Sequence, residues 1–353
     1  MRNRKRLHAE VSRDAQRSDS RFTEAALPCA SRLTSAPKIR EYVGELANLA
    51  TFSYSLRSTF NLGKTLMKFA FSTVACPEWD LDTVATKARE YGYDGVEIRG
   101  FLNEAILTAA NVFLTDPVKV RQTFQTAGVE IACLASSIAM KGNRRADVQA
   151  ASDLRKYIDV AQSIGCRIVK LFDTHLRPGT DRAGAAVAMG QWLLPLGDYA
   201  AEHDVLLVVE NMLSFRNAKE LWMMLDMNGH PAVAACWDVF NAALVGESPY
   251  ISVPTLNSRI QYTQVKDAKL GSLGATLCPL GEGDVAVQIF LTRMRGIGYE
   301  GYVTFEWEKA WLPNITGPEV SLPAAIQKLK EWTRPAGEEA VEVAEAEAVA
   351  VAV

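Results

Sequence analysis

Short apolar segments alternate with helical patterns along residues 67–334, and this alternation restricts the fold more than any other feature of the chain. Strands that alternate with helices form parallel sheets, and eight such strands suit a closed (β/α)₈ TIM barrel. A doubly wound open sheet is the alternative, but the residues after the first strand, 72–79, read STVACPEW and carry no GxGxxG motif. The predicted strands are Lys68–Ser72, Gly95–Ile98, Val129–Ala135, Arg167–Phe172, Val205–Glu210, Val233–Trp237, Ile260–Val265 and Gly301–Trp307.

Helical patterns fill most of the intervals between these strands, and polar or glycine residues mark several of their ends. The predicted helices are Leu81–Tyr91, Pro117–Thr126, Ala146–Ile164, Ala183–Ala201, Ala218–Met227 and Val285–Gly296. Asp80, Asp116 and Asp284 precede three of them and are expected to be N-caps. Asp284 closes the GEGD turn at 281–284, whose glycine amides could instead approach a phosphate or a sugar hydroxyl. We expect the capping role.

The two ends of the chain differ in composition from the part between them. Residues 1–66 begin with an arginine-rich, apolar-poor segment, and residues 335–353 are a low-complexity tail of Ala, Val and Glu. An organelle-targeting segment, a disordered extension and an over-extended gene start are alternatives for the first part. The sequence MKFAFSTVACPEW from Met67 predicts the first strand. We therefore expect one barrel domain at 67–334 with low-order extensions on both sides.

The composition excludes several classes of protein. The 353 residues carry a formal net charge of −3, and this mild acidity gives no electrostatic footprint for nucleic acid. No apolar stretch is long enough to span a bilayer. The six cysteines are scattered without a CxxC pair, which favours reduced, buried thiols in a cytoplasmic protein over a disulfide framework.

Four strand-like segments in the second half of the chain each carry an oxygen-bearing side chain at or near the end. These side chains are Glu210, Asp238, Gln264 and Glu306. A barrel gathers the carboxyl ends of its strands at one rim, where active sites lie. Converging carboxylates repel one another, and a bound divalent metal would relieve this repulsion. Oxygen ligands favour a hard cation such as Mn²⁺ or Mg²⁺.

The alternative is that these acids form salt bridges at the rim with Lys170, Arg99 or Lys266. Lys266 shares a strand face with Gln264 and could also polarise a substrate oxygen. Arg99 follows the second strand and could bind a substrate carboxylate or phosphate.

Three histidines and one further acid of residues 67–334 have side chains that suit an active site. His175 follows the fourth strand and is a candidate general acid or hydrogen-bond donor. Glu308 shares the face of Glu306 but lies farther out, which favours a supporting role. His203 and His230 lie on the helix-to-strand side and are not expected in the site.

Residues 67–334 resemble the xylose isomerase-like TIM-barrel superfamily, which includes sugar phosphate isomerases and epimerases. The matching segments are GYDGVEIRG (92–100), VVEN (208–211), CWDVFN (236–241), QVKDA (264–268), LGEGDV (280–285) and GYEGYVTFEWE (298–308). The resemblance implies that Glu210, Asp238, Gln264 and Glu306 bind a divalent metal, commonly manganese, magnesium or cobalt. It also implies that Glu210 and Glu306 act as acid and base, and that dimers or tetramers are common.

One residue departs from the family pattern, because Gln264 stands where the family usually has a histidine. The expected function is a metal-dependent isomerase or epimerase of a sugar, sugar acid or related keto-polyol, acting through an ene-diolate. Glutamine at this position also occurs in similar dehydratases. A dehydratase of a cyclic keto-polyol, such as an inosose or a dehydroshikimate-like compound, is therefore the first alternative. A non-catalytic barrel that serves as a binding module is the second.

Overall fold

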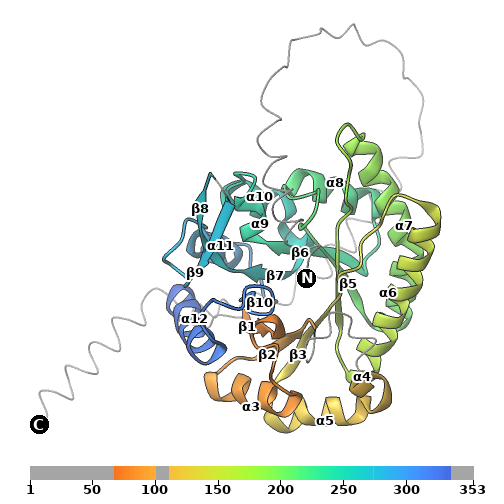
Figure 1. The fold of residues 1–353 in the computed structure, drawn as a ribbon. Helices are drawn as coiled ribbons and strands as arrows, with labels where there is room; N and C mark the ends of the chain where they lie inside the picture. The colour runs from red at the N-terminus through yellow and green to blue at the C-terminus, as the bar shows by residue number, and fades with distance from the viewer. Residues whose placement is uncertain (1–66, 101–110, 273, 335–353) are drawn as a thin grey trace, which may run out of the picture. The chain divides into compact units, whose positions relative to one another are not determined.

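The computed structural model describes residues 67–100, 111–272 and 274–334, and they form a TIM barrel. Eight parallel strands close in the order β1-β10-β7-β6-β5-β4-β3-β2, and helices connect them around the outside (Figure 1). The parallel barrel predicted from the alternation of strands and helices is thus confirmed. The predicted extensions at 1–66 and 335–353 lie outside the described residues.

The barrel strands agree with the predicted segments to within a few residues at each end. Hydrogen-bonded pairing of β1 with both β2 and β10 closes the cylinder. Pairing of Asp238 with Gln264 places the ends of β6 and β7 side by side. The strands are β1 Lys68–Ser72, β2 Gly95–Ile98, β3 Glu130–Ala135, β4 Ile168–Phe172, β5 Leu206–Glu210, β6 Val233–Asp238, β7 Ile260–Val265 and β10 Tyr302–Phe305.

Six long helices correspond to the predicted ones: α3 Leu81–Tyr91, α5 Pro117–Ala127, α6 Arg144–Ile164, α7 Arg182–Glu202, α8 Ala218–Asn228 and α11 Val287–Gly296. Further elements were not expected: α4 Asn111–Thr115, α9 Val239–Ala243, α10 Pro249–Leu256, α12 Pro318–Thr333, and the 3₁₀ turns η1 Thr73–Ala75 and η3 Asn257–Arg259. A two-stranded antiparallel hairpin, β8 Asp267–Gly271 with β9 Gly274–Cys278, follows β7.

Helix ends follow the sequence signals in most places. Asp80 and Asp116 cap α3 and α5, because their carboxylates accept hydrogen bonds from the backbone N–H groups of Thr83 and Lys119. Gly92 ends α3 with a φ of 82°, a left-handed conformation that glycine adopts without steric cost. These local signals set where each helix returns to the next strand.

The expected N-cap role of Asp284 is wrong. Helix α11 begins at Val287, and the carboxylate of Asp284 instead accepts a hydrogen bond from the N–H of Leu270 in the hairpin. The GEGD turn is organised by Asp267, whose Oδ2 accepts from the N–H groups of Gly281 and Gly283 at 2.9 and 3.0 Å. The turn therefore closes on a carboxylate of the chain itself.

The core has two parts. The larger part lies between the strands and the surrounding helices, and the smaller part fills the barrel interior. The interior part consists of small side chains with two tyrosines: Ala70, Ala132, Cys133, Ala135, Val208, Ala234, Cys236, Tyr262 and Tyr302. Because these residues fill the interior, the polar side chains of the strand ends gather above them at one end of the barrel.

Two further expectations concern the thiols and the membrane. Among the described cysteines, which are all free, Cys76, Cys133, Cys166 and Cys236 are buried, as predicted, whereas Cys278 is only partly buried. None of the helices in the described part of the chain has the length and apolar character needed to cross a bilayer.

Candidate active site

The four predicted strand-end residues converge at the carboxyl end of the barrel. Glu210 and Asp238 are the last residues of β5 and β6, Gln264 lies in β7, and Glu306 directly follows β10. All four are buried, with exposed fractions of 2% or less. The predicted convergence is therefore present in the structure.

The side-chain amide of Asn241 donates hydrogen bonds to two of these carboxylates. Asn241 Nδ2 lies 3.3 Å from Glu210 Oε1 and 3.1 Å from Asp238 Oδ2. Asp238 is also the N-cap of α9, because its Oδ1 accepts from the N–H groups of Phe240 and Asn241. The first turn of α9 therefore fixes both acids. This role of Asn241 was not predicted from the sequence.

Lys266 places its ammonium group among three acids. Its Nζ lies 3.0 Å from Asp238 Oδ2 and 3.2 Å from Glu308 Oε1, and it donates a short hydrogen bond to Glu306 Oε2. The lysine side chain is only 2% exposed, and its Nζ also lies 5.1 Å from the centre of the Phe240 ring. Lys266 thus bridges the acids at the ends of β6 and β10.

Arg99 places a second cation between two acids. Its Nη1 lies 3.3 Å from Glu306 Oε1 and 3.9 Å from Glu210 Oε2. The guanidinium carbon lies about 5 Å from the ring centres of both Phe172 and Trp311, at 4.9 and 5.0 Å. Arg99 is only 5% exposed, so it is a buried part of the cluster rather than a surface arginine.

Lys170 and Glu97 form a deeper ion pair inside the barrel. Lys170 Nζ lies 2.7 Å from Glu210 Oε2 and 3.6 Å from Glu97 Oε1, and all three side chains are almost fully buried. Lys170 was predicted only as a salt-bridge partner, and Glu97 was not predicted as a site residue. The signal was available, because Glu97 lies two residues before Arg99 in GVEIRG and hence on the same strand face.

Gln264 directs its amide nitrogen, not its oxygen, at the acids. Its Nε2 lies 3.0 and 3.1 Å from the two carboxylate oxygens of Glu97 and 3.5 Å from Glu306 Oε1. Its oxygen faces the thiol of Cys236 at 3.9 Å. This orientation follows from hydrogen bonding, because an amide oxygen turned towards two carboxylates would face only acceptors.

Burial and neighbouring charges oppose each other in setting the pKa values of these acids. Burial raises the pKa of Asp238 to about 6 against the lowering effect of the Lys266 ammonium. Burial also raises the pKa of Glu97. For Glu306, burial acts upwards, but the nearby cations Lys266, Lys170 and Arg99 outweigh it and lower the pKa. The acids of the cluster are therefore not equivalent as proton donors or acceptors.

The basic groups remain protonated. Burial acts to lower the pKa of Lys170 and of Lys266, but the carboxylates beside them outweigh it and raise both values. The same opposition raises the pKa of Arg99. These side chains are therefore fixed positive charges, and the lysines are not neutral amines that could attack a carbonyl.

Comparison with known families agrees with this architecture. The family model described as xylose isomerase-like TIM barrel matches residues 85–336, more than half of the chain. The chain belongs to the xylose isomerase-like TIM barrel family. No curated protein compared with the sequence matches it.

This chain matches several solved structures of the same fold over almost the full length of those structures. The IolI protein, crystallised with a bound zinc atom, is 15% identical, with a TM-score of 0.64 over 76% of this chain and 98% of that one. A probable 3-DHS dehydratase, AsbF from Bacillus anthracis, is 14% identical, with a TM-score of 0.61 over 75% and 99%. A D-allulose 3-epimerase from Methylomonas sp., solved with D-allulose, is 19% identical, with a TM-score of 0.57 over 75% and 96%. At these identities the likeness establishes the fold.

The four predicted metal ligands of this xylose isomerase-like barrel are not arranged to fit a metal site. No three His, Cys, Asp or Glu side chains of the described residues are grouped so that they could hold a metal ion. Glu210, Asp238 and Glu306 each contact a buried cation, and the oxygen of Gln264 points to Cys236. Metal ligation by these four residues stays a prediction. The structure instead contains the alternative contacts, which are salt bridges of these acids with Lys170, Arg99 and Lys266.

The histidine candidate lies apart from this cluster. His175 is exposed on the loop after β4, and the described residues provide no contact between it and the carboxylates. His203 ends α7 and His230 follows α8, so both lie on the helix-to-strand side, as expected. A catalytic role for His175 stays a prediction without a supporting contact.

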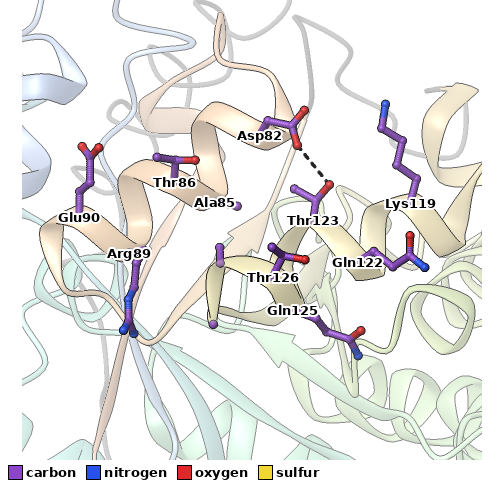
Figure 2. Close-up of a pocket in the computed structure, with 12 residues that line it drawn as sticks. Asp82, Ala85, Thr86, Arg89, Glu90, Lys119, Gln122, Thr123, Gln125 and Thr126 are labelled. Carbon is purple, nitrogen blue, oxygen red and sulfur yellow. Dashed lines mark hydrogen bonds between the residues drawn. The ribbon is translucent and has the colours of Figure 1, made fainter.

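One surface cleft in the described part of the chain lies away from this cluster. It measures about 770 Å³ and lies between α3 and α5 on the outside of the barrel (Figure 2). Figure 2 shows Asp82 of α3 directed at Thr123 of α5, with a hydrogen bond of 3.2 Å between them. None of the strand-end acids lines this cleft. The candidate catalytic groups therefore lie in the buried cluster and not in this cleft.

Proposed function

We propose that this chain is an isomerase or epimerase that moves a proton next to the carbonyl group of a small sugar, sugar acid or keto-polyol. The observation that carries the proposal is the position of Arg99, whose Nη1 contacts both Glu210 and Glu306. Two carboxylates on either side of one cation can act as proton acceptor and donor around a substrate oxygen. The epimerases among the solved structures of the same fold support this reaction class.

The residues of the cluster have distinct roles in this reaction. One carboxylate, Glu210 or Glu306, removes the proton from the carbon beside the carbonyl, and the electron pair moves onto the carbonyl oxygen. The resulting ene-diolate carries negative charge, which a buried cation such as Lys266 or Arg99 stabilises more strongly than water does. Return of the proton to the opposite face gives the epimer. Return to the neighbouring carbon gives the isomer, while the hydroxyl proton of the first carbon passes to the former carbonyl oxygen.

A resident Mn²⁺ ion on Glu210, Asp238, Gln264 and Glu306 is a prediction from the sequence. The donor arrangement does not support it, and no step of this mechanism depends on it. A cytoplasmic location and a homo-oligomeric assembly are likewise predictions.

Loss of a β-hydroxyl from the same ene-diolate would give a dehydratase instead. One observation favours keeping this second function: Lys266 Nζ lies beside three acids, where its ammonium group could donate a hydrogen bond to a leaving hydroxyl. The solved structure of a probable dehydratase with the same fold is consistent with it.

The test is to incubate the purified protein in D₂O with a panel of ketohexoses and inososes and to follow the products by NMR. Isomerase or epimerase activity introduces deuterium at carbon and yields an isomer of equal composition. A dehydrated product would assign the alternative reaction, and no change with any compound would favour a non-catalytic binding module.

A further inference from the structure

Three buried cations occupy the interior of the strand-end cluster, and each one lies between acids from different strands. Lys170 lies between Glu97 and Glu210, and Arg99 lies between Glu210 and Glu306. Lys266 contacts Asp238, Glu306 and Glu308. Every carboxylate of the predicted metal site is therefore already paired with a positive side chain.

The position of Lys266 is the most informative of the three. Its ammonium group bridges Asp238 and Glu306, two of the carboxylates that would have to share a metal ion. A divalent cation at that point would meet an ammonium group at close range, and in a buried site this repulsion is only weakly screened. Metal and ammonium thus compete for the same oxygens.

The cations also have binding capacity that the protein does not use. The donors Lys170 Nζ and Arg99 Nε are buried without an aligned hydrogen bond among the described residues, and so is one acceptor, Glu210 Oε2. The contact of 2.7 Å between Lys170 and Glu210 is ionic rather than an aligned hydrogen bond. Buried donors without partners are costly, so they indicate a place for a ligand oxygen.

We propose that Lys266, together with Lys170 and Arg99, takes the place of a divalent metal, and that the site binds the anionic oxygen of its substrate without one. This inference rests on the proposed function for the identity of that oxygen, the ene-diolate oxygen of a polyhydroxy carbonyl compound. The claim about metal binding stands on the ion pairs alone and is measured without substrate.

The chemistry balances without a metal ion. The carbon–hydrogen bond beside the carbonyl breaks, the proton goes to a carboxylate, and the electron pair becomes the new carbon–carbon double bond as the carbonyl electrons move to oxygen. The oxygen gains negative charge beside groups that are already positive. No oxidant or other reactant is needed, and the proton returns to carbon in the second half of the reaction.

The experiment titrates Mn²⁺ and Zn²⁺ into the full chain after treatment with EDTA, and it follows binding by calorimetry and metal content by mass spectrometry. The wild-type protein is expected to bind neither ion at micromolar concentration. Lys266→Met and Lys170→Met remove the competing charge while keeping similar bulk. They are expected to gain affinity on the order of a hundredfold or more. Lys68→Met removes an exposed lysine that is paired with Glu130, and it should change nothing.

Two results would overturn the proposal: one equivalent of Mn²⁺ or Zn²⁺ bound tightly by the wild-type protein, or folded lysine variants that bind metal no better than it does. Circular dichroism establishes whether the variants fold, and Lys266→Gln and Lys170→Gln replace any methionine variant that does not. Because no substrate is present, the outcome is independent of whether the proposed isomerase activity is found.

Discussion

Lys170 Nζ lies 2.7 Å from Glu210 Oε2, and both side chains are almost completely buried inside the barrel. The two residues come from the neighbouring strands β4 and β5. Breaking a buried ion pair by removal of one partner leaves a charge without compensation, which is far more costly than loss of an exposed pair. This pair therefore links the stability of the barrel to the charge balance of the candidate site.

Replacement of Lys170 by methionine should destabilise the protein by about 3–5 kcal/mol, because Glu210 and Glu97 would both lose their nearest cation. Urea denaturation at neutral pH measures this change. Lys68→Met is the matched control, since its pair with Glu130 is largely exposed and should contribute at most about 1 kcal/mol. Equal losses in the two variants would show that burial of the Lys170 pair does not matter.

Replacement of Glu306 by glutamine should reduce turnover by about 10²–10⁴-fold, because it removes a candidate proton-transfer group while keeping the shape of the side chain. Asp238 and Glu308 remain as partners for Lys266, so the fold should persist. Activity and the circular dichroism spectrum are measured together. Normal turnover in this variant would remove Glu306 from the mechanism.

Replacement of Gly283 by alanine should destabilise the loop after the β8–β9 hairpin by about 1–3 kcal/mol. An added Cβ would lie 1.9 Å from Asp267 Oδ1, and Asp267 is held in place by several backbone hydrogen bonds. Gly296→Ala is the control, because a Cβ at the end of α11 would meet nothing within 4 Å. Thermal unfolding compares the variants, and a Gly283→Ala protein as stable as the control would contradict the packing described.

Asp173 should make stability depend on pH. Burial raises the pKa of this carboxylate from 3.8 to about 7, although the backbone N–H groups of Phe215, Leu213 and Ser214 act in the opposite direction. Because the folded protein holds the proton more tightly than the unfolded chain, ionisation of Asp173 disfavours folding. Its effect on stability is absent below about pH 4 and grows as the pH rises to about 7.

The comparison with Asp173→Asn isolates this effect, since asparagine does not titrate. The free energy of unfolding of the wild-type protein, relative to that variant, should fall by at most about 1.4 kcal/mol per pH unit between pH 4 and pH 7. Urea denaturation at several pH values provides the curve. A difference that rises with pH would show that the backbone donors dominate and hold the carboxylate ionised.

Most of the barrel was predictable because short strand-like segments alternate regularly with helical patterns along the chain. β1, β2 and β7 have the bounds expected from the sequence. The β8–β9 hairpin was not predicted, because its residues are largely exposed and show no regular burial pattern. Asp284 was misassigned because an acid before a helical pattern has the signature of an N-cap, and only tertiary contact reveals its bond to Leu270.

The convergence of Glu210, Asp238 and Glu306 was predictable because all three lie at strand ends. This prediction did not require knowledge of how their side chains are oriented. Their partners were harder to predict. A lysine side chain has a long reach, so Lys266 could pair with any of several acids at the rim. Glu97 meets Gln264 across the barrel from a position 167 residues away in the sequence, and no local pattern encodes such a contact.

The most direct test of the account is the rate of deuterium incorporation into a keto-sugar or inosose by the EDTA-treated protein in D₂O, with and without added Mn²⁺. We expect incorporation beside the carbonyl at a rate that added Mn²⁺ does not raise, because Lys266, Lys170 and Arg99 already supply the positive charge. Incorporation that disappears on treatment with EDTA and returns with Mn²⁺ would contradict it.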